Sequence, residues 1–519
     1  MQVFKADKVP FCYSCTILLF RRSAKNVVFW SIRCETHFVG KQIMVIRFMN
    51  GPLRFLVYLA VIAVIVSGSL FYLSKESPPS LFPGGGLTAS PPPPWKKTQR
   101  AVAEANEDFS VEYLGSEPSG DGKVKSLTWG ASWPQFNGAQ RDNRSPETGL
   151  LEAWPIDGPP LLWSARGLGN GYSSVAVVAG VVFTLGNKAE SEVMIALEAR
   201  SGKKIWCTPF ARASHASMGD GPRGTPAVSD GAVYGMGAEG ELARFDTKTG
   251  EIQWHRNILT DYSAPNIGWG ISESVLIDGD RLICTPGGSK ATMVALDKNT
   301  GKEIWRSIVD GEHAGYASAI VVEIDGVRQY VQFLAGGVAG IRADDGTFLW
   351  KNTKPSSGTA NCSSPLVWGN HVFCASNYGT GGSLIKLVSA SRSTTAELVY
   401  HTQDMKSHHG DMVIEKGMLF GSNDPGILMC LDVETGKVKW QNRSIGKGAV
   451  TFAEGKIYLR GENSEIALVE ATGDEYRELG RFEQPDRSSA NAWSHPVVAN
   501  GCLFLRDQGL LLCYNLKRN

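Results

Sequence analysis

An eleven-residue phrase recurs along the chain and constrains its fold more than any other feature. The phrase is complete at residues 244–254, 295–305 and 430–440, where an aspartate lies eight positions and a glycine four positions before a tryptophan. Copies at 196–206 and 340–350 keep the glycine and the tryptophan. Spacings of 48, 51, 45 and 90 residues separate these tryptophans, which are Trp206, Trp254, Trp305, Trp350 and Trp440. A period near 45 residues, with a degenerate copy ending at Tyr400 inside the longest gap, indicates a repeat architecture.

Each copy has the chemistry of a strand, a tight turn and a second strand. Glycine adopts the positive φ that such a turn needs, and the aspartate and threonine before it hydrogen-bond turn amides. The tryptophan offers a large apolar surface to a neighbouring sheet. Two more short strand patterns lie upstream of each copy, as in 364–376. Each unit therefore offers four strands, and the chain is predicted to be all-β.

Four-stranded units repeated radially form a β-propeller. Eight third-strand endings are counted, at Glu198, Asp246, Asp297, Arg342, Val388, Asp432, Val469 and Tyr514. The last unit lacks a fourth strand, and we expect the segment around Trp163 to supply it and so close the ring. The prediction is an eight-bladed propeller over 128–519 with four antiparallel strands per blade. Seven blades would require one degenerate copy to be an insertion.

The first 127 residues have a different composition. Residues 55–73 contain no charge over a length that can span a bilayer, and mostly Lys and Arg precede them. We expect one transmembrane anchor there, with the N-terminus cytoplasmic and the propeller in the periplasm or cell exterior; a cleaved signal peptide is the alternative. Residues 1–54 form a basic leader, whose upstream part we interpret as a mis-assigned start before Met44 or Met49. Residues 74–127, rich in Pro and Gly, are predicted to be a disordered linker.

The charge balance and the cysteine positions argue against several kinds of binding site. Lys plus Arg number 52 against 51 Asp plus Glu, so nucleic-acid binding is not expected. Cys502 and Cys513 flank a short turn and could form a disulfide, but two buried thiols are favoured. No Cys/His cluster has zinc spacing, and no metal site is predicted. We expect a monomer.

The repeat resembles the tryptophan-docking motif of the PQQ-like propellers, a family named for pyrroloquinoline quinone (PQQ). This family includes quinoprotein alcohol dehydrogenases and propellers without the cofactor, such as the BamB-type outer-membrane assembly lipoprotein. The lead-in at 133–163, "WPQFNGAQRDNRSPETGLLEAWPIDGPPLLW", is similar to the opening of a group common in planctomycetes and often labelled polyvinyl-alcohol dehydrogenase or BamB-like. The resemblance covers about residues 130–519 and is specific for the fold, because the motif is a packing device.

In a propeller the first strand of each blade lines the central channel, and its entry loop faces the ligand side. The entries carry aromatic, cationic and acidic groups, including Tyr316, Asn361, His408 and Asp411. The predicted cofactor-binding residues are Arg223, Trp269, Glu273, His409, Lys447, Trp493 and His495. Arginine and lysine could hold carboxylates, and tryptophan could stack on a flat ring. His408 and His409 alternate if they lie on a strand, so only one is expected to face the channel. Alternatively, these polar groups satisfy one another and bind nothing.

Two functions follow from the resemblance. The favoured one is a membrane-tethered, non-catalytic binding or assembly scaffold, similar to BamB, which docks protein or peptide partners of the cell envelope without a cofactor. The alternative is a PQQ-dependent alcohol dehydrogenase that uses PQQ with Ca²⁺ at the channel mouth. Such enzymes commonly have a pair of adjacent cysteines, and this sequence has none. No catalytic residue is assigned.

Overall fold

The computed structural model describes residues 18–24, 27–33, 109–113 and 132–518. Near the N-terminus, β1 (Leu18–Ala24) and β2 (Val27–Arg33) pair as an antiparallel hairpin. The predicted anchor at 55–73, the rest of the leader and most of the linker lie outside the described residues. In the described part, α3 (Ile258–Tyr262) is the helix, and no helix there is long and apolar enough to cross a membrane.

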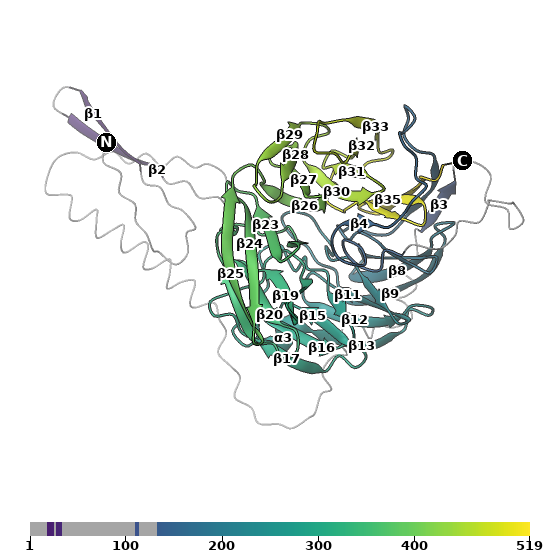
Figure 1. The fold of residues 1–519 in the computed structure, drawn as a ribbon, viewed down its shortest axis with the longest axis horizontal. Helices are drawn as coiled ribbons and strands as arrows, with labels where there is room; N and C mark the ends of the chain where they lie inside the picture. Colours follow the sequence, from purple (N-terminus) through teal and green to yellow (C-terminus); the bar gives the residue numbers. More distant parts are fainter. Residues whose placement is uncertain (1–17, 25–26, 34–108, 114–131, 519) are drawn as a thin grey trace, which may run out of the picture. The chain divides into compact units, whose positions relative to one another are not determined.

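Residues 132–518 form a ring of eight antiparallel sheets, which confirms the eight-bladed propeller (Figure 1). The first four blades contain β6 (Ala176–Val178), β7 (Val181–Lys188), β8 (Ser191–Glu198) and β9 (Lys204–Arg212); β10 (Ala227–Ser229), β11 (Ala232–Met236), β12 (Glu241–Asp246) and β13 (Ile252–Asn257); β14 (Leu276–Asp278), β15 (Arg281–Cys284), β16 (Met293–Asp297) and β17 (Glu303–Ser307); β18 (Ile320–Ile324), β19 (Val327–Phe333), β20 (Val338–Arg342) and β21 (Phe348–Asn352).

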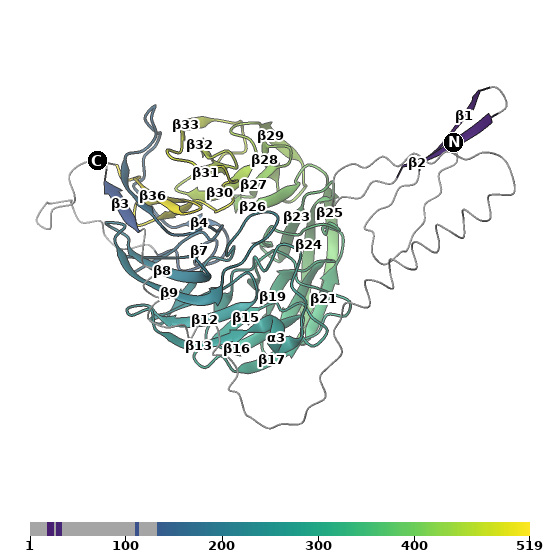
Figure 2. The same cartoon turned by 180° about the vertical axis from the view of Figure 1, so that it is seen from behind.

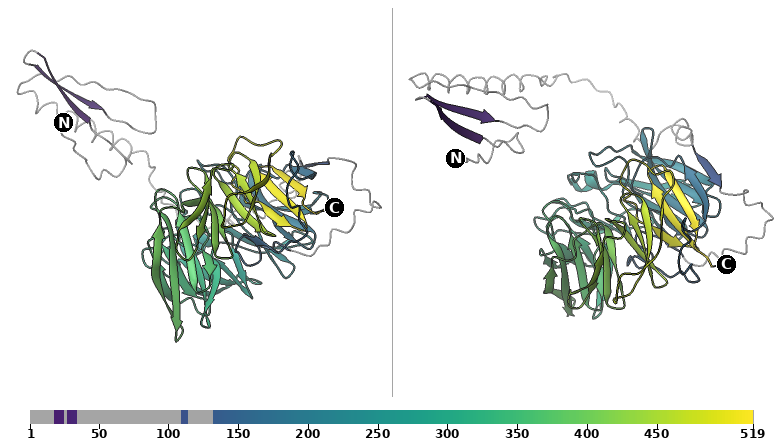
Figure 3. Two further views of the ribbon diagram at one scale, coloured as in Figure 1. Left: turned by 45° about the horizontal axis from the view of Figure 1, so that its top comes forward. Right: turned by 90° about the horizontal axis from the view of Figure 1, so that it is seen from above.

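The other four blades follow in chain order around the ring (Figure 3). They contain β22 (Leu366–Trp368), β23 (His371–Ser376), β24 (Gly381–Ala390) and β25 (Ser393–Thr402); β26 (Ser407–Glu415), β27 (Met418–Asn423), β28 (Ile427–Asp432) and β29 (Val438–Asn442); β30 (Gly448–Ala453), β31 (Lys456–Gly461), β32 (Glu465–Glu470) and β33 (Glu478–Glu483); β34 (Val497–Ala499), β35 (Cys502–Asp507), β36 (Leu510–Asn515) and β5 (Leu161–Arg166). First strands of neighbouring blades contact each other, as β10 does β14 and β26 does β30, so they form the inner wall.

The eighth blade joins the two ends of the propeller. Strand β5, which contains Trp163, pairs with β36 and confirms the predicted closure. A fifth strand, β3 (Ser110–Tyr113), pairs with the outer edge of β5 (Figures 1 and 2). The sequence places β3 inside the predicted linker, so part of that linker is a strand of the blade. Cys502 and Cys513 are buried free thiols, as favoured from the sequence.

The recurring phrase joins each blade to the next. Asp246 Oδ1 accepts hydrogen bonds from the amides of Lys248 and Thr249 at 2.8 and 2.9 Å, and Gly250 has φ +73°. The ring of Trp206, from the preceding blade, lies so close that a Cβ on Gly250 would sit 2.6 Å from it. Trp206 Nε1 also donates to the carbonyl of Thr247 at 3.0 Å. Equivalent tryptophan-to-glycine contacts hold Trp163 on Gly202, Trp254 on Gly301 and Trp305 on Gly346.

One blade departs from this pattern where the sequence degenerates. The fifth blade has the turn Ser391–Arg392 between its ten-residue strands β24 and β25, with φ of 49° and 68°, and no glycine there. Trp350 of the preceding blade donates to Gln329 Oε1 at 2.6 Å within its own blade. Tyr400 packs against the next blade in place of a tryptophan, and its hydroxyl donates to the carbonyl of Val433 at 2.7 Å.

Residues 133–145, here called the plug, occupy the central channel. The plug hydrogen-bonds to residues on or next to the first strands of six blades. These contacts join Trp133 to Val177, Pro134 to Val228, Arg141 to Ser274 and Val275, Asn137 to Asp411, Asn143 to Val450, and Ser145 to Val498. Arg141 is buried and donates to the carbonyls of Ser274 and Val275 at 2.7 and 2.9 Å. The channel is therefore filled by the chain itself, and any ligand site at its mouth has a floor.

Candidate functional site

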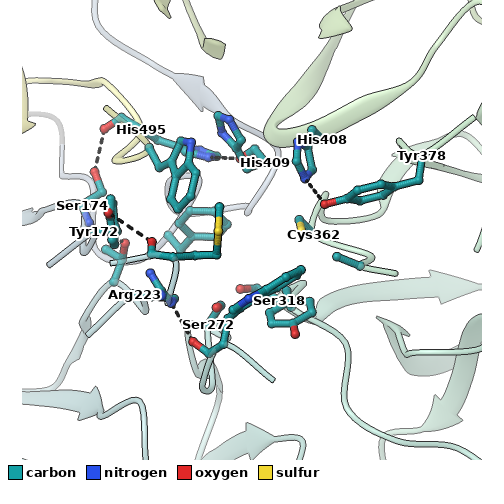
Figure 4. Close-up of a pocket in the computed structure, with 17 residues that line it drawn as sticks. Tyr172, Ser174, Arg223, Ser272, Ser318, Cys362, Tyr378, His408, His409 and His495 are labelled. Carbon is teal, nitrogen blue, oxygen red and sulfur yellow. Dashed lines mark hydrogen bonds between the residues drawn. The ribbon is translucent and has the colours of Figure 1, made fainter. Parts of the chain in front are cut away.

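A blind, mostly apolar pocket lies at the mouth of the channel, above the plug (Figure 4). It encloses about 160 Å³. The entry segments before the first strands of six blades supply most of the lining. The plug contributes Phe136, whose ring centroid lies 4.9 Å from that of His495. The loops that lead into the short inner strands thus place side chains around the channel mouth, and no separate domain is needed to form the pocket.

Aromatic rings form most of the wall. Tyr172 packs against Trp493, with ring centroids 4.9 Å apart, and Trp493 packs against His409 at 5.5 Å. On the other side, Trp269 packs against Tyr316 at 5.4 Å. Aromatic faces exposed around a hollow favour a flat, apolar guest, because such rings prefer offset or edge contacts with other rings.

Hydroxyl groups beneath the rings tie the blades together. The amide of Ser174 donates to Thr225 Oγ1 at 3.2 Å, the amide of Thr225 to Ser274 Oγ at 2.8 Å, and the amide of Ser274 to Ser318 Oγ at 2.9 Å. Asp411 continues the series by accepting from the amide of Ser364 at 2.6 Å. These groups satisfy one another between blades, which is the structural alternative expected from the sequence for polar channel residues.

Arg223 brings the positive charge of the pocket wall. Its Nε donates to the carbonyl of Trp269 and its Nη2 to that of Gly219, both at 2.9 Å. The guanidinium lies 5.0 Å from the ring centroid of Tyr172. Burial lowers the pKa of Arg223, but arginine remains charged at neutral pH. Its Nη1 is buried and has no hydrogen-bond partner. One donor of a fixed cation that lines the pocket therefore has no partner within the protein.

Three histidines line the opposite side of the pocket, and the expectation that only one of His408 and His409 faces it is wrong. The pairing of β26 with β27 is irregular between Ser407 and Met412, and Asp411 has φ +52°, so strand alternation fails there. Both rings line the pocket, 5.3 Å apart between centroids. Burial, with His409 and Lys447 nearby, lowers the pKa of His408 to about 4.

The hydrogen bonds of His409 and His495 fix their tautomers. His409 Nε2 lies 2.8 Å from the Glu462 carboxylate, and His495 Nε2 lies 2.8 Å from the carbonyl of His409. Each partner accepts only, so Nε2 carries the hydrogen in both rings. Burial lowers the pKa of His409, so this ring is neutral at pH 7. The Nδ1 atoms of both rings are buried and have no partner, and that of His409 is an unused acceptor.

Glu462 does not line the pocket but holds the side chains of two residues that do. It accepts from Trp493 Nε1 at 2.6 Å and from His409 Nε2 at 2.8 Å, and pairs with Lys447 at 3.1 Å. Burial raises the pKa of Glu462, but these three partners together outweigh burial and lower the pKa to about 2. Glu462 is thus ionised, and all three contacts fall on its Oε1, which orients Trp493 and His409.

The structure brings most of the predicted site residues together. Five of the seven line the pocket: Arg223, Trp269, His409, Trp493 and His495. Lys447 lies outside the lining and reaches the site through Glu462. Glu273 is also outside it, buried beneath the wall, where its carboxylate accepts from Thr285 N and Oγ1 at 2.8 and 2.9 Å. Whether these residues bind a cofactor stays a prediction.

Sequence reasoning missed other wall residues. Tyr172 lies in the entry of the first blade, and the pattern Gly171-Tyr172 before small residues matches Gly315-Tyr316, so this signal was present in the sequence. Cys362 and Tyr378 also line the pocket. Burial raises the pKa of the Cys362 thiol to about 12, so it is no nucleophile at neutral pH. No local pattern indicated that Phe136 would form part of the floor.

The donors at the mouth do not fit a quinone held by calcium. Calcium takes six to eight oxygen ligands, several of them carboxylates. Among the described residues, no three His, Cys, Asp or Glu side chains converge as metal ligands would. Glu462 is occupied as above, and Asp424 Oδ2 accepts from Asn377 at 2.5 Å and lies 3.7 Å from Lys447. The residues present thus offer a flat apolar slot with one cation.

Comparison with known proteins identifies relatives of two kinds. The sequence family described as "outer membrane protein assembly factor BamB" matches residues 160–265 and 189–442, which together span more than half of the chain. BamB of Yersinia pestis is 24% identical over 54% of this chain and 71% of its own length. The quinohemoprotein alcohol dehydrogenase ADH-IIG of Pseudomonas putida is 30% identical, but the match covers 28% of this chain and 21% of that enzyme.

Solved structures of both kinds align with this chain. The crystal structure of BamB from Moraxella catarrhalis aligns over 69% of this chain and 98% of its own, with a TM-score of 0.49 and 15% identity. Quinohemoprotein alcohol dehydrogenase from Comamonas testosteroni aligns over 75% of this chain and 81% of its own, with a TM-score of 0.49 and 12% identity.

Proposed function

The chain belongs to the BamB family of propellers, and on this premise we propose that it is a non-catalytic binding or assembly scaffold of the cell envelope. The observation that carries the proposal is the extent of the family match, over 160–442, whereas the dehydrogenase match covers about a quarter of the chain. The partners are envelope proteins or peptides, docked on the face that contains the mouth pocket.

The chemistry of the mouth supports binding over oxidation. A dehydrogenase of the quinone type needs a carboxylate free to act as a base and a cradle for the metal. Glu462 Oε1 accepts from His409 and Trp493 behind the pocket wall, and Glu273 and Asp411 lie buried in hydrogen bonds to Thr285, Asn137 and Ser364. Aromatic rings with one free cationic donor instead suit the capture of a group from solution or from a partner.

The location proposed for this scaffold is the outer side of a membrane. The apolar segment at 55–73, with basic residues before it, is proposed as an uncleaved anchor that leaves the propeller in the periplasm or cell exterior, as a monomer. A reporter fused after Asn519 tests this. Activity of alkaline phosphatase fused there, with silence of a cytoplasmic reporter at the same place, is expected; the reverse pattern would refute it.

Site-specific crosslinking in cells tests the binding role. A photoreactive residue replaces Tyr378, which lies at the mouth and is 45% exposed, or Ile156, which is 93% exposed and does not line the pocket. The proposal predicts a discrete protein adduct from position 378 that purifies with an envelope protein, and none from position 156. Equal adducts from both positions, or none from 378 in a folded chain, would contradict docking at the mouth.

A further inference from the structure

The mouth pocket has unsatisfied polar atoms on two opposite sides, and these define the ligand it can take. On one side, Arg223 Nη1 is a buried donor with no partner. On the other, His409 and His495 present buried Nδ1 atoms with no partner, and His495 is only 6% exposed. A buried polar group left unpaired costs about 1–3 kcal/mol, so a ligand that pairs it gains correspondingly.

The walls between these two sides fix the shape of the ligand. Trp269 and Tyr316 form one aromatic wall, and Tyr172 and Trp493 form another. The lining contains no carboxylate, since Glu462 lies behind His409 and Trp493. A cation would meet Arg223 with no compensating anion. An aliphatic chain would leave the polar atoms unpaired.

We propose that the mouth pocket binds a small, planar aryl monocarboxylate that carries a hydrogen-bond donor such as a ring hydroxyl. Its carboxylate pairs with Arg223 Nη1, its ring lies between the aromatic walls, and its hydroxyl donates to Nδ1 of His409 or His495. Phe136 of the plug closes the bottom of the pocket, so the ligand enters and leaves by the mouth alone. The inference rests on the proposed binding role of the same mouth and adds the chemistry of its ligand.

Three features keep Arg223 ready for an anion. Its Nε and Nη2 are held by backbone carbonyls, its face lies over Tyr172, and its charge is not consumed by a carboxylate in these contacts. A guanidinium fixed in this way loses little freedom when it binds, and a charge-assisted hydrogen bond is roughly twice as strong as a neutral one. Anion recognition therefore dominates selectivity.

Calorimetry on the full-length protein in mild detergent tests the proposal. The probes are 4-hydroxybenzoate and the longer 6-hydroxy-2-naphthoate, each beside its neutral amide and its analogue without the hydroxyl. At least one hydroxy acid is expected to bind saturably at one site. Its amide should bind at least tenfold more weakly, and its analogue without the hydroxyl several-fold more weakly. Failure of both acids to bind, or equal binding of acid and amide, overturns the proposal.

Two variants locate the binding. Arg223→Gln removes the cation, and Trp269→Leu removes one wall but keeps the backbone carbonyl that holds Arg223. Each is expected to weaken the acid at least tenfold, and Arg223→Gln to abolish discrimination between acid and amide. Trp368→Leu, a tryptophan outside the pocket lining, is the control and should bind as wild type does. Circular dichroism establishes that each variant is folded; binding unchanged in folded Arg223→Gln and Trp269→Leu would place the ligand elsewhere.

The crosslinking experiment separates this inference from the proposed function. Crosslinking from position 378 without binding of either acid overturns the ligand class and leaves the scaffold standing. Binding of an acid with no crosslink supports the ligand class and contradicts protein docking at the mouth. Suppression of the crosslink by saturating acid supports both and shows that ligand and partner compete.

Discussion

A tryptophan packs against the turn glycine of the next blade, and this contact predicts how far a methyl group added to that glycine lowers the free energy of unfolding. Gly250→Ala adds a Cβ at a φ of +73° and places it 2.6 Å from the Trp206 ring. Gly231, in the same blade, has φ +75° and nothing within 4 Å of a built Cβ, so Gly231→Ala is a matched control for backbone strain alone.

The magnitudes follow from these two environments. Left-handed backbone at a non-glycine residue costs about 1–2 kcal/mol, which Gly231→Ala should show. Gly250→Ala should cost this plus about 1–3 kcal/mol for overpacking, because Trp206 is buried and its Nε1 is tied to Thr247. In a Trp206→Leu background the extra cost of Gly250→Ala should fall, and what is left reflects the contact of the same Cβ with Thr208 Oγ1 at 2.7 Å.

Thermal unfolding by circular dichroism measures the difference. For large domains, 1 kcal/mol shifts the Tm by no more than about 2–4 °C, so all variants are compared in one buffer and at one scan rate. Gly250→Ala should lower the Tm roughly one and a half to four times as far as Gly231→Ala does. Equal shifts, or an extra cost that is undiminished in Trp206→Leu, would refute the view that the ring packs directly on the glycine.

Three further predictions concern buried polar groups. Burial raises the pKa of Glu192 to about 7 from 4.5, so between these pH values the folded state keeps a proton that the unfolded state loses. The free energy of unfolding of the wild type should therefore fall by up to about 3 kcal/mol as the pH rises from 4.5 to 7. Denaturation curves at several pH values should show a flatter pH dependence for Glu192→Gln, and the same pH dependence in both proteins would contradict the prediction. Arg141→Met leaves the two carbonyls of Ser274 and Val275 unpaired, so it should cost about 2–6 kcal/mol and raise hydrogen exchange across residues 133–145. Unchanged exchange there would show that Arg141 does not hold the plug. The Cys362 thiol, with its pKa raised to about 12, should react with iodoacetamide at pH 8 at least about a hundredfold more slowly than in urea, and rapid native labelling would contradict the raised pKa.

The sequence predicts those parts of the fold that repeat locally. The aspartate, glycine and tryptophan of each phrase lie within eleven residues, so the tight turn and the packing tryptophan can be predicted without tertiary information. Closure by the strand with Trp163 also follows, because the eighth unit lacks a fourth strand. The plug does not follow in this way: Arg141 contacts Ser274 and Asn143 contacts Val450, across 133 and 307 residues, with polar side chains that have no periodicity.

The sequence predicts where the candidate site lies better than it predicts how the side chains of the site are oriented. The rule that entry loops face one mouth placed Arg223, Trp269 and Trp493 together, and the structure does so. It failed for Glu273, whose carboxylate turns down to Thr285. The expectation of strand alternation failed for the pair His408–His409, because the irregular pairing of β26 cannot be read from residue types.

Titration with PQQ in the presence of calcium tests the central claim, a non-catalytic binding propeller, most directly. The full-length protein is titrated by calorimetry with and without calcium, then assayed for alcohol-dependent reduction of an artificial electron acceptor. We expect no calcium-dependent binding and no turnover. Saturable binding at micromolar or tighter affinity, with alcohol oxidation that Arg223→Ala and Trp269→Ala abolish, would contradict it and make the protein a quinone-dependent dehydrogenase.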